Sequence, residues 1–121
     1  MQSSAQPNVN VVFDASFLDV YTGGDREIRD QVLNLFLDQA QLLLKRLKDA
    51  QGDERAWHEA AHSLKGCASG VGANALAAIA REAEKEAASS TDAQAAMIEE
   101  LAAAFKAAAG QVRLLLQPIK L

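Results

Sequence analysis

Proline is missing from the whole middle of this chain. The two prolines, Pro7 and Pro118, lie near the ends of the 121-residue sequence, so about 110 residues contain no residue that breaks a helix. Half of the residues are apolar, but only 5% are aromatic. Alanine is abundant after residue 56 and combines the highest helix propensity with little bulk, so it favours closely packed helices. We therefore expect an all-α fold.

Capping residues, glycines and the spacing of apolar residues divide the chain into five expected helices. These are a short helix capped by Asp14 and stopped by Gly23-Gly24, a long helix starting at Asp25, and three more over about 54–69, from about 73, and over about 93–117. Short connections favour antiparallel neighbours. We predict an antiparallel up-down four-helix bundle with a short extra N-terminal helix, formed by residues 13–121 after a flexible arm of residues 1–12.

The long helix has apolar residues on a wide face. Spacings of three and four residues predict a buried stripe that is widened by Leu33, Leu37 and Leu44. The stripe consists of Ile28, Val32, Leu35, Phe36, Gln39, Leu42, Leu43 and Leu47.

Charge and cysteine content limit the setting in which the chain works. The formal net charge of −4 argues against general affinity for nucleic acid or anionic membranes. No apolar run approaches the roughly 18–20 residues that span a bilayer, and residues 1–8 lack the pattern of a signal peptide. Cys67 is the only cysteine and is expected to be a small core residue, which suits a reducing cytoplasm.

The third expected helix separates an apolar side from a chemically unusual side. At 100° per residue, the core side is formed by Trp57, Ala60, Ala61, Leu64 and Ala68. The opposite side carries His58, His62, Lys65, Gly66 and Ser69, so both histidines of the protein are expected to face solvent.

His62 has two informative neighbours on the surface of this helix. Lys65 at i+3 supplies a cation beside the imidazole, and Gly66 at i+4 removes the side chain that would cover it. Glycine costs about 1 kcal/mol relative to alanine inside a helix, so its presence needs a reason. An exposed imidazole has a large neutral fraction at pH 7, and the neutral form is the nucleophile. The pattern indicates a landing site for a phosphoryl group.

These residues resemble the signature of the histidine-containing phosphotransfer (HPt) domain family of two-component phosphorelays. His62-Ser63-Leu64-Lys65-Gly66 matches a histidine, any residue, leucine, lysine and glycine, and Gly72 follows ten residues after the histidine. The resemblance covers about residues 12–115, including Phe17-Leu18, the Gly-Gly-Asp turn, Phe36-Leu37 and the segment from Leu76 to Glu84.

The resemblance implies a phosphocarrier rather than an enzyme. It implies that His62 accepts a phosphoryl group, that Lys65 helps to hold it, and that Gly66 admits the partner. Ser69, Gly72, Phe17 and Leu18 are expected to belong to the partner-docking surface, and Glu84 and His58 to support His62. The implied partners are a response-regulator receiver domain, which contributes an aspartate and Mg²⁺, and a sensor or hybrid histidine kinase. The chain has no recognisable nucleotide-binding loop and is expected to need no cofactor of its own.

Two other interpretations use the same residues. His58-Glu59-Ala60-Ala61-His62 also spells the H-E-x-x-H string of zinc peptidases, with Glu82 or Glu84 as a conceivable third ligand. A helical chain offers no substrate cleft of the usual kind, and Lys65 would repel the metal, so we expect no metal site. The second interpretation is a helical binding module that sequesters a partner without phosphotransfer.

Overall fold

A computed structural model describes residues 11–116 of the chain, in which every regular element is a helix. The helices are α1 (Ala15–Thr22), α2 (Arg26–Asp49), α3 (Glu54–Ser69), α4 (Asn74–Glu84) and α5 (Thr91–Leu116). All five expected helices are present, and α5 begins two residues before the expected start. Residues 1–10 and 117–121 lie outside the described part, and with them most of the predicted arm and the expected last residue of α5.

Aspartate caps start the first three helices. The side chains of Asp14, Asp25 and Asp53 accept hydrogen bonds from the backbone N–H groups of Ser16, Ile28 and Ala56, respectively, at 3.1 Å. These bonds satisfy amide donors that have no partner within the helix. Gly23 ends α1 in the left-handed conformation, with φ of 62°.

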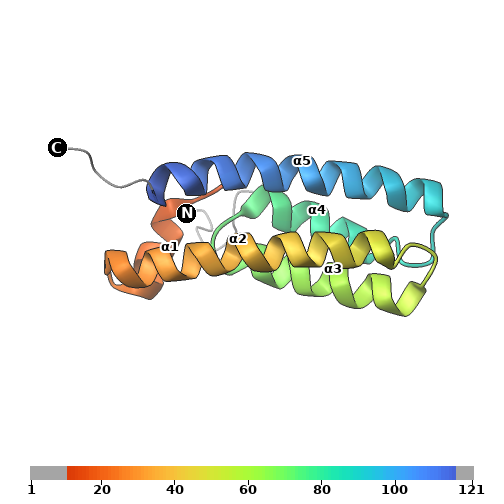
Figure 1. The fold of residues 1–121 in the computed structure, drawn as a ribbon, viewed down its shortest axis with the longest axis horizontal. Helices are drawn as coiled ribbons and strands as arrows, with labels where there is room; N and C mark the ends of the chain where they lie inside the picture. Colours follow the sequence, from red (N-terminus) through yellow and green to blue (C-terminus); the bar gives the residue numbers. More distant parts are fainter. Residues whose placement is uncertain (1–10, 117–121) are drawn as a thin grey trace, which may run out of the picture.

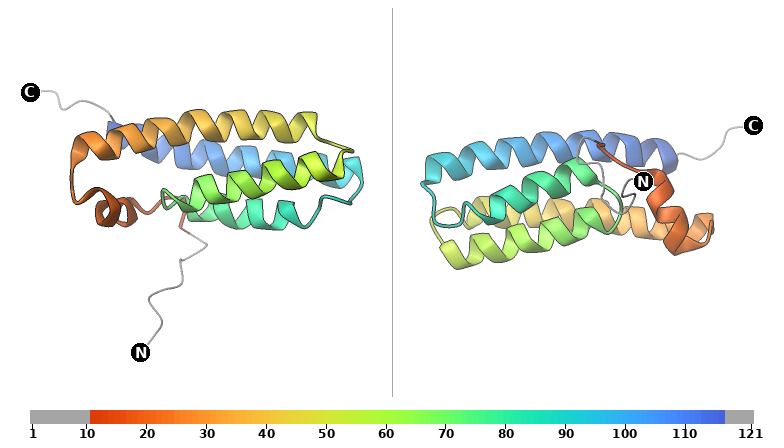
Figure 2. Two further views of the ribbon diagram at one scale, coloured as in Figure 1. Left: turned by 90° about the horizontal axis from the view of Figure 1, so that it is seen from below. Right: turned by 180° about the vertical axis from the view of Figure 1, so that it is seen from behind.

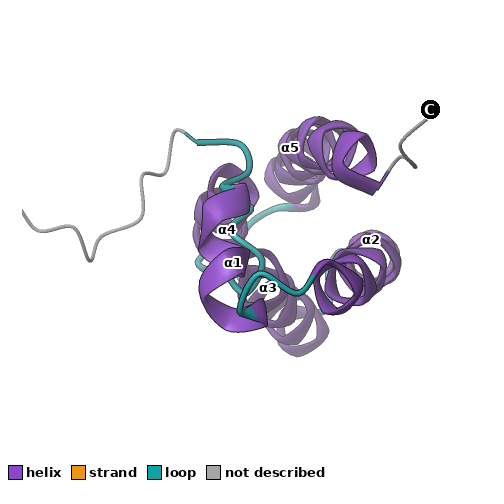
Figure 3. Cartoon of the chain, turned by 90° about the vertical axis from the view of Figure 1, so that its left-hand side faces the viewer, coloured by secondary structure: helices purple, strands orange, loops and turns teal. Residues whose placement is uncertain are grey.

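Helices α2 to α5 form a closed ring. α2 packs against α3, α3 against α4, α4 against α5, and α5 against α2. Seen along the bundle, these four helices surround a common centre and α1 lies at one end (Figure 3). The views from the side show neighbouring helices running in opposite directions, with the short α4 beside α3 (Figures 1 and 2). The predicted four-helix bundle with an extra N-terminal helix is confirmed.

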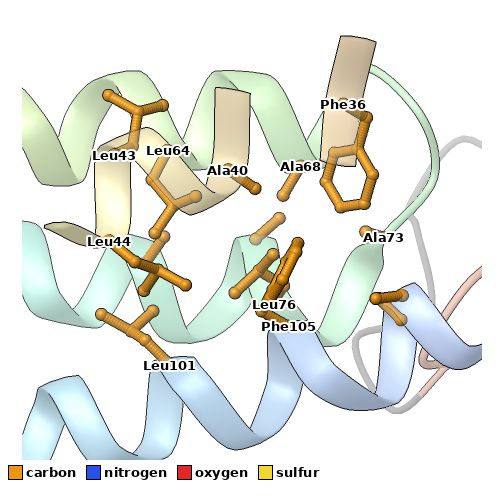
Figure 4. Packing of buried hydrophobic residues seen from close by; sticks show 14 of the residues in the cluster. Phe36, Ala40, Leu43, Leu44, Leu64, Ala68, Ala73, Leu76, Leu101 and Phe105 are labelled. Atoms are coloured by element: carbon orange, nitrogen blue, oxygen red, sulfur yellow. The ribbon is translucent and has the colours of Figure 1, made fainter. Parts of the chain in front are cut away.

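The core is built from aliphatic residues and alanines, with few aromatic rings (Figure 4). Phe36 of α2 and Phe105 of α5 contact each other across it, with ring centroids 6.0 Å apart. Leu64 and Ala68 from α3 and Leu76 from α4 are fully buried in the same core (Figure 4). Alanines on α3 and α4 let these two helices approach closely, which matters for the site that they form.

The predicted buried stripe of α2 is partly wrong. Ile28, Leu35 and Leu42 are exposed, with 47%, 59% and 41% of their surface accessible. The residues that were expected only to widen the stripe, including Leu33 and Leu37, are buried instead. α2 carries leucines around most of its circumference, so its own periodicity does not decide which face turns inward. The packing of α3 and α5 against it does.

A buried glutamine ties the loops together at the end of the bundle far from α1. Gln94 is fully buried, accepts a hydrogen bond from the backbone N–H of Gly52 at 3.1 Å, and donates to the carbonyls of Glu86 and Ala87. A buried amide is stable only when its polar atoms have hydrogen-bond partners in this way.

None of the helices in residues 11–116 is both long enough and apolar enough to cross a membrane.

Candidate functional site

The two faces of α3 lie as its sequence predicted. Trp57, Ala60, Ala61, Leu64 and Ala68 are buried. On the other side, the side chains of His58 and His62 are 55% and 63% exposed, and that of Lys65 is 27% exposed. Both histidines therefore stand on the solvent face of one helix, a single turn apart.

Trp57 fixes the register between α3 and α4. Its indole Nε1 donates a hydrogen bond of 2.7 Å to the carbonyl of Ala83, and both residues are fully buried. A buried indole N–H needs such a partner, so the bond holds the end of α4 against α3. The next residue after Ala83 is Glu84, and this register places its carboxylate beside the histidine face of α3.

Glu84 gathers three side chains of α3. Its Oε2 lies 2.8 Å from Nδ1 of His62 and 3.3 Å from Nε2 of His58. Its Oε1 lies 3.0 Å from Nζ of Lys65. Only 15% of the Glu84 side chain is accessible, so the carboxylate is well covered while the imidazoles remain open to solvent.

The charge state of Glu84 decides the tautomer of His62. The pKa of Glu84 is lowered from its ordinary value by the hydrogen bond from Lys65 and then by that from His62, against an opposing effect of burial. An ionised carboxylate only accepts hydrogen bonds, so Nδ1 of His62 carries the hydrogen. In the neutral ring, Nε2 then holds the free lone pair.

Gly66 leaves the space beside His62 open. A methyl group built on its Cα would meet no atom within 4 Å outside the backbone of its own helix. Ser69 is exposed one turn later, and its Oγ donates to the carbonyl of Lys65 at 2.7 Å. These residues continue the accessible face of α3 past the imidazole.

A groove between α2 and α3 runs beside this face. It has a volume of about 590 Å³ and is lined by Val32, Leu35, Phe36, Gln39, Leu43, Arg46, Ser63, Gly66, Cys67, Gly70 and Val71. Ser63 and Gly66 place it next to His62. Leu35, wrongly expected in the core, lies in this groove. Cys67 also lines this groove and is partly buried. This burial removes water from its thiol and raises the pKa of the thiol.

Three residues expected on the docking surface have other positions. Leu18 is 1% exposed and belongs to the core. Gly72 is buried against the N-terminal segment: its carbonyl accepts from the backbone N–H of Asp14 at 2.8 Å, and a Cβ on it would stand 2.7 Å from the Asp14 carbonyl oxygen. Phe17 is half-buried at the same contact, 3.3 Å from that hypothetical Cβ. Gly72 and Leu18 therefore hold α1 in place, and their assignment to a docking surface was wrong.

The H-E-x-x-H string does not form a metal centre within residues 11–116, where no three histidine, cysteine or acidic side chains are arranged to hold an ion. Glu82, one imagined ligand, lies near Lys85 instead, with Oε2 to Nζ at 3.4 Å. Both histidines contact the carboxylate of Glu84, and the ammonium of Lys65 contacts the same carboxylate.

Comparison with known protein families shows a match to the Hpt domain over residues 31–114, about two thirds of the chain. The chain belongs to the Hpt domain family. A solved structure with the same fold is histidine-containing phosphotransfer protein B (HptB) from Pseudomonas aeruginosa PAO1. The two are 25% identical and superpose with a TM-score of 0.76, over 85% of this chain and 92% of the other. No curated protein sequence matches this chain.

Membership of the Hpt family places the chain among the histidine phosphotransfer domains of phosphorelays. The signature residues His62, Lys65 and Gly66 were found from the sequence because they lie within two turns of one helix. The common carboxylate contact of His58 and His62 had no sequence signal. It depends on the register between α3 and α4, which Trp57 and Ala83 set across 26 positions of the chain.

Proposed function

We propose that this Hpt domain accepts a phosphoryl group on Nε2 of His62 and exchanges it with an aspartate of a response-regulator receiver domain. The observation that carries the proposal is the 2.8 Å contact between Nδ1 of His62 and Glu84. It directs the free lone pair of the neutral ring to the other nitrogen, on a side chain that is 63% exposed. Glu84 therefore holds Nδ1 of His62, and Nε2 is available to accept the phosphoryl group.

The reaction is a displacement at phosphorus. The Nε2 lone pair attacks the phosphorus of an aspartyl phosphate, the N–P bond forms, and the P–O bond to the aspartate breaks. The aspartate leaves as a carboxylate with the bonding electron pair. The imidazole ring keeps its Nδ1 hydrogen and gains positive charge as the bond forms. The negative charge of Glu84 lies where that charge develops, so it stabilises the transition state and the phosphohistidine.

Lys65 supplies the cation for the phosphoryl oxygens. Its ammonium contacts Oε1 of Glu84 at 3.0 Å, and an ammonium has three donors, so this contact leaves others for a phosphoryl group. Glu84 thereby keeps Lys65 near His62 before transfer. Mg²⁺ is expected on the receiver domain, next to its own aspartate.

The partner approaches over Gly66 and the groove between α2 and α3. The missing side chain at Gly66 lets another backbone come close to His62, and the groove offers apolar surface from Val32 and Leu35. Docking requires apolar area as well as charge. A receiver domain and a sensor or hybrid histidine kinase would use this face in turn, with Ser69 at its edge.

The test is phosphotransfer from a purified, phosphorylated receiver domain, with radiolabel followed to this chain. The unaltered protein should acquire an acid-labile, base-stable label. His62→Gln should acquire none, because glutamine has no nucleophilic nitrogen. His58→Gln serves as the matched control, since it removes the other histidine from the same helix face and should still be labelled.

Each result separates the proposal from a binding module. If His62→Gln keeps its label, His62 is the wrong site. If none of a full set of receiver domains from the same cell labels the unaltered protein, although some bind it, the chain sequesters partners without phosphotransfer.

A further inference from the structure

One cation lies in the groove between α2 and α3. Of the eleven described residues that line the groove, Arg46 is the only one with a charged side chain. It is exposed, and it lies on the same flank of α2 as Leu35 and Gln39, at helical spacings of four and seven residues. Ser63 of α3 lines the groove at the same end, because Arg46 and Ser63 also line the adjoining hollow together. The cation is therefore at the end of the groove next to the position that follows His62.

The guanidinium of Arg46 has no ion-pair partner within residues 11–116. Two acidic residues, Asp49 and Glu59, line the adjoining hollow with it, but neither forms an ion pair with it, and Glu59 pairs with Arg55 at 3.3 Å instead. A guanidinium presents its N–H donors in a planar fork that fits a carboxylate with two parallel hydrogen bonds. Arg46 is thus available to an acidic group from another molecule.

The rest of the groove indicates what kind of molecule carries that group. Its α2 wall presents Val32, which is half-buried, and Leu35, which is 59% exposed. A small anion would pair with Arg46 but leave this apolar surface in water, whereas a protein surface can cover both. Once water is excluded from the groove, an ion pair at its end is stronger than one in bulk water. The occupant that fits is a protein surface with apolar side chains and an acidic side chain beside them.

We propose that Arg46 is a specificity-determining residue, which selects receiver domains that place an acidic side chain at this end of the groove. A receiver with a basic side chain there would be repelled, and this repulsion contributes to selection as much as the attraction does. The inference rests on the proposed function, because it takes a receiver domain as the occupant of the groove. Arg46 acts on docking and not on the transfer step at His62.

The first experiment measures binding without phosphoryl transfer, by calorimetry with unphosphorylated receiver domains from the same cell. For the receiver that binds the unaltered protein most tightly, Arg46→Gln should raise Kd about fivefold, the upper range for an exposed ion pair. Arg46→Glu brings two negative charges together and should raise Kd by more than about tenfold. Both losses should shrink in 1 M salt, which screens the charges.

Lys45→Gln is the matched control for these variants. Lys45 is the preceding residue of α2, is also exposed, and does not line the groove. The substitution changes the net charge by the same amount as Arg46→Gln, and it should leave Kd unchanged.

Charge reversal on the receiver identifies the acidic group. Each exposed acidic residue on the face around the receiver's phosphorylated aspartate is changed to lysine in turn. One of these receiver variants should bind Arg46→Glu more tightly than it binds the unaltered protein, because opposite charges again face each other.

Single-turnover transfer at increasing concentrations of the phosphorylated receiver separates docking from the transfer step. Arg46→Gln should raise the half-saturating concentration about fivefold and leave the maximal rate unchanged. A lower maximal rate at an unchanged half-saturating concentration would place Arg46 in the transfer step and overturn the inference.

The binding results decide the inference separately from the proposed function. An unchanged Kd in Arg46→Gln overturns it, and so does an equal loss in Lys45→Gln or a complete set of receivers of which none binds the unaltered protein. If a receiver binds through Arg46 but never labels His62, the proposed function fails and the selection by Arg46 stands.

Discussion

At the scale of single residues, the site depends on one carboxylate. Glu84 contacts Nδ1 of His62 and Nζ of Lys65 with its two oxygens, so it orients the nucleophile and holds the cation at the same time. The family resemblance implied a supporting role for this residue, but not that its two oxygens divide these contacts. Side chains that meet between helices cannot be paired from the sequence when the register between those helices is unknown.

Glu84→Ala should therefore slow phosphoryl transfer without preventing it. Loss of a hydrogen bond to a charged group is worth about 1.5–3 kcal/mol, which corresponds to roughly a tenfold or greater decrease in rate. Glu84→Gln, which keeps an acceptor oxygen but loses the charge, should fall between the alanine variant and the unaltered protein. Single-turnover transfer from a phosphorylated receiver measures the rates, and equal rates for all three proteins would remove Glu84 from the site.

Gly66 should show opposite effects on stability and on function. Gly66→Ala adds a methyl group that meets no surrounding atom, so it should stabilise α3 by about 0.5–1 kcal/mol through helix propensity. The same methyl group stands where the partner approaches, and a displacement of about 1 Å in the reacting groups can cost up to about a hundredfold in rate. Urea unfolding and single-turnover transfer measure the two effects.

Gly110→Ala is the matched control. Gly110 is an exposed glycine within α5, and a methyl group there also meets nothing within 4 Å. This variant should gain similar stability and transfer at the original rate. If Gly66→Ala also transfers at the original rate, the space above Gly66 is not used by the partner.

At the scale of helices, α3 was the easiest element to predict and α2 the hardest. The outward face of α3 follows from one amphipathic pattern with alanine and tryptophan on the other side. α2 offers leucine on several faces, and Leu35 and Leu42 lie outside although their spacing fitted a buried stripe.

Gly72 was assigned wrongly for a related reason. A glycine after a helix has the same appearance in the sequence whether a partner or the chain itself packs against it.

The contact between α3 and α4 should be sensitive to the loss of a single hydrogen bond. Trp57→Phe keeps an aromatic ring in the core but removes the N–H that donates to the carbonyl of Ala83, which then keeps the bond of 2.9 Å from the backbone N–H of Glu86. The net contribution of one such hydrogen bond is about 0.5–1.5 kcal/mol, and we expect a loss of that size in urea unfolding. The end of α4 should also become more mobile, seen as faster amide hydrogen exchange there. Unchanged stability and exchange would mean that this bond does not set the register.

At the scale of the whole molecule, the residue that organises the site, Glu84, also contributes to the stability of the folded bundle. Glu84 links α4 to α3 through its charge, and its pKa is lowered from an ordinary value of 4.5. A carboxyl group with a lowered pKa stabilises the folded state fully above its ordinary pKa, and this contribution is lost as pH falls through the lowered value. Stability should therefore decrease below pH 4.5.

Glu84→Gln tests this dependence. Glutamine does not titrate, so the variant should be less stable than the unaltered protein at pH 6, and the difference should narrow as pH falls below 4.5. Urea unfolding at several values of pH measures it. A difference that stays constant from pH 6 to pH 3 would show that the charge of Glu84 does not contribute to stability.

The central claim is that Nε2 of His62 carries the phosphoryl group while Glu84 holds Nδ1. The most direct measurement is an NMR spectrum of the protein after labelling by a phosphorylated receiver domain, with ³¹P and ¹⁵N detection to identify the bonded nitrogen. We expect a single phosphohistidine at His62, bonded through Nε2. A phosphoryl group on Nδ1 of His62, or on either nitrogen of His58, would contradict it.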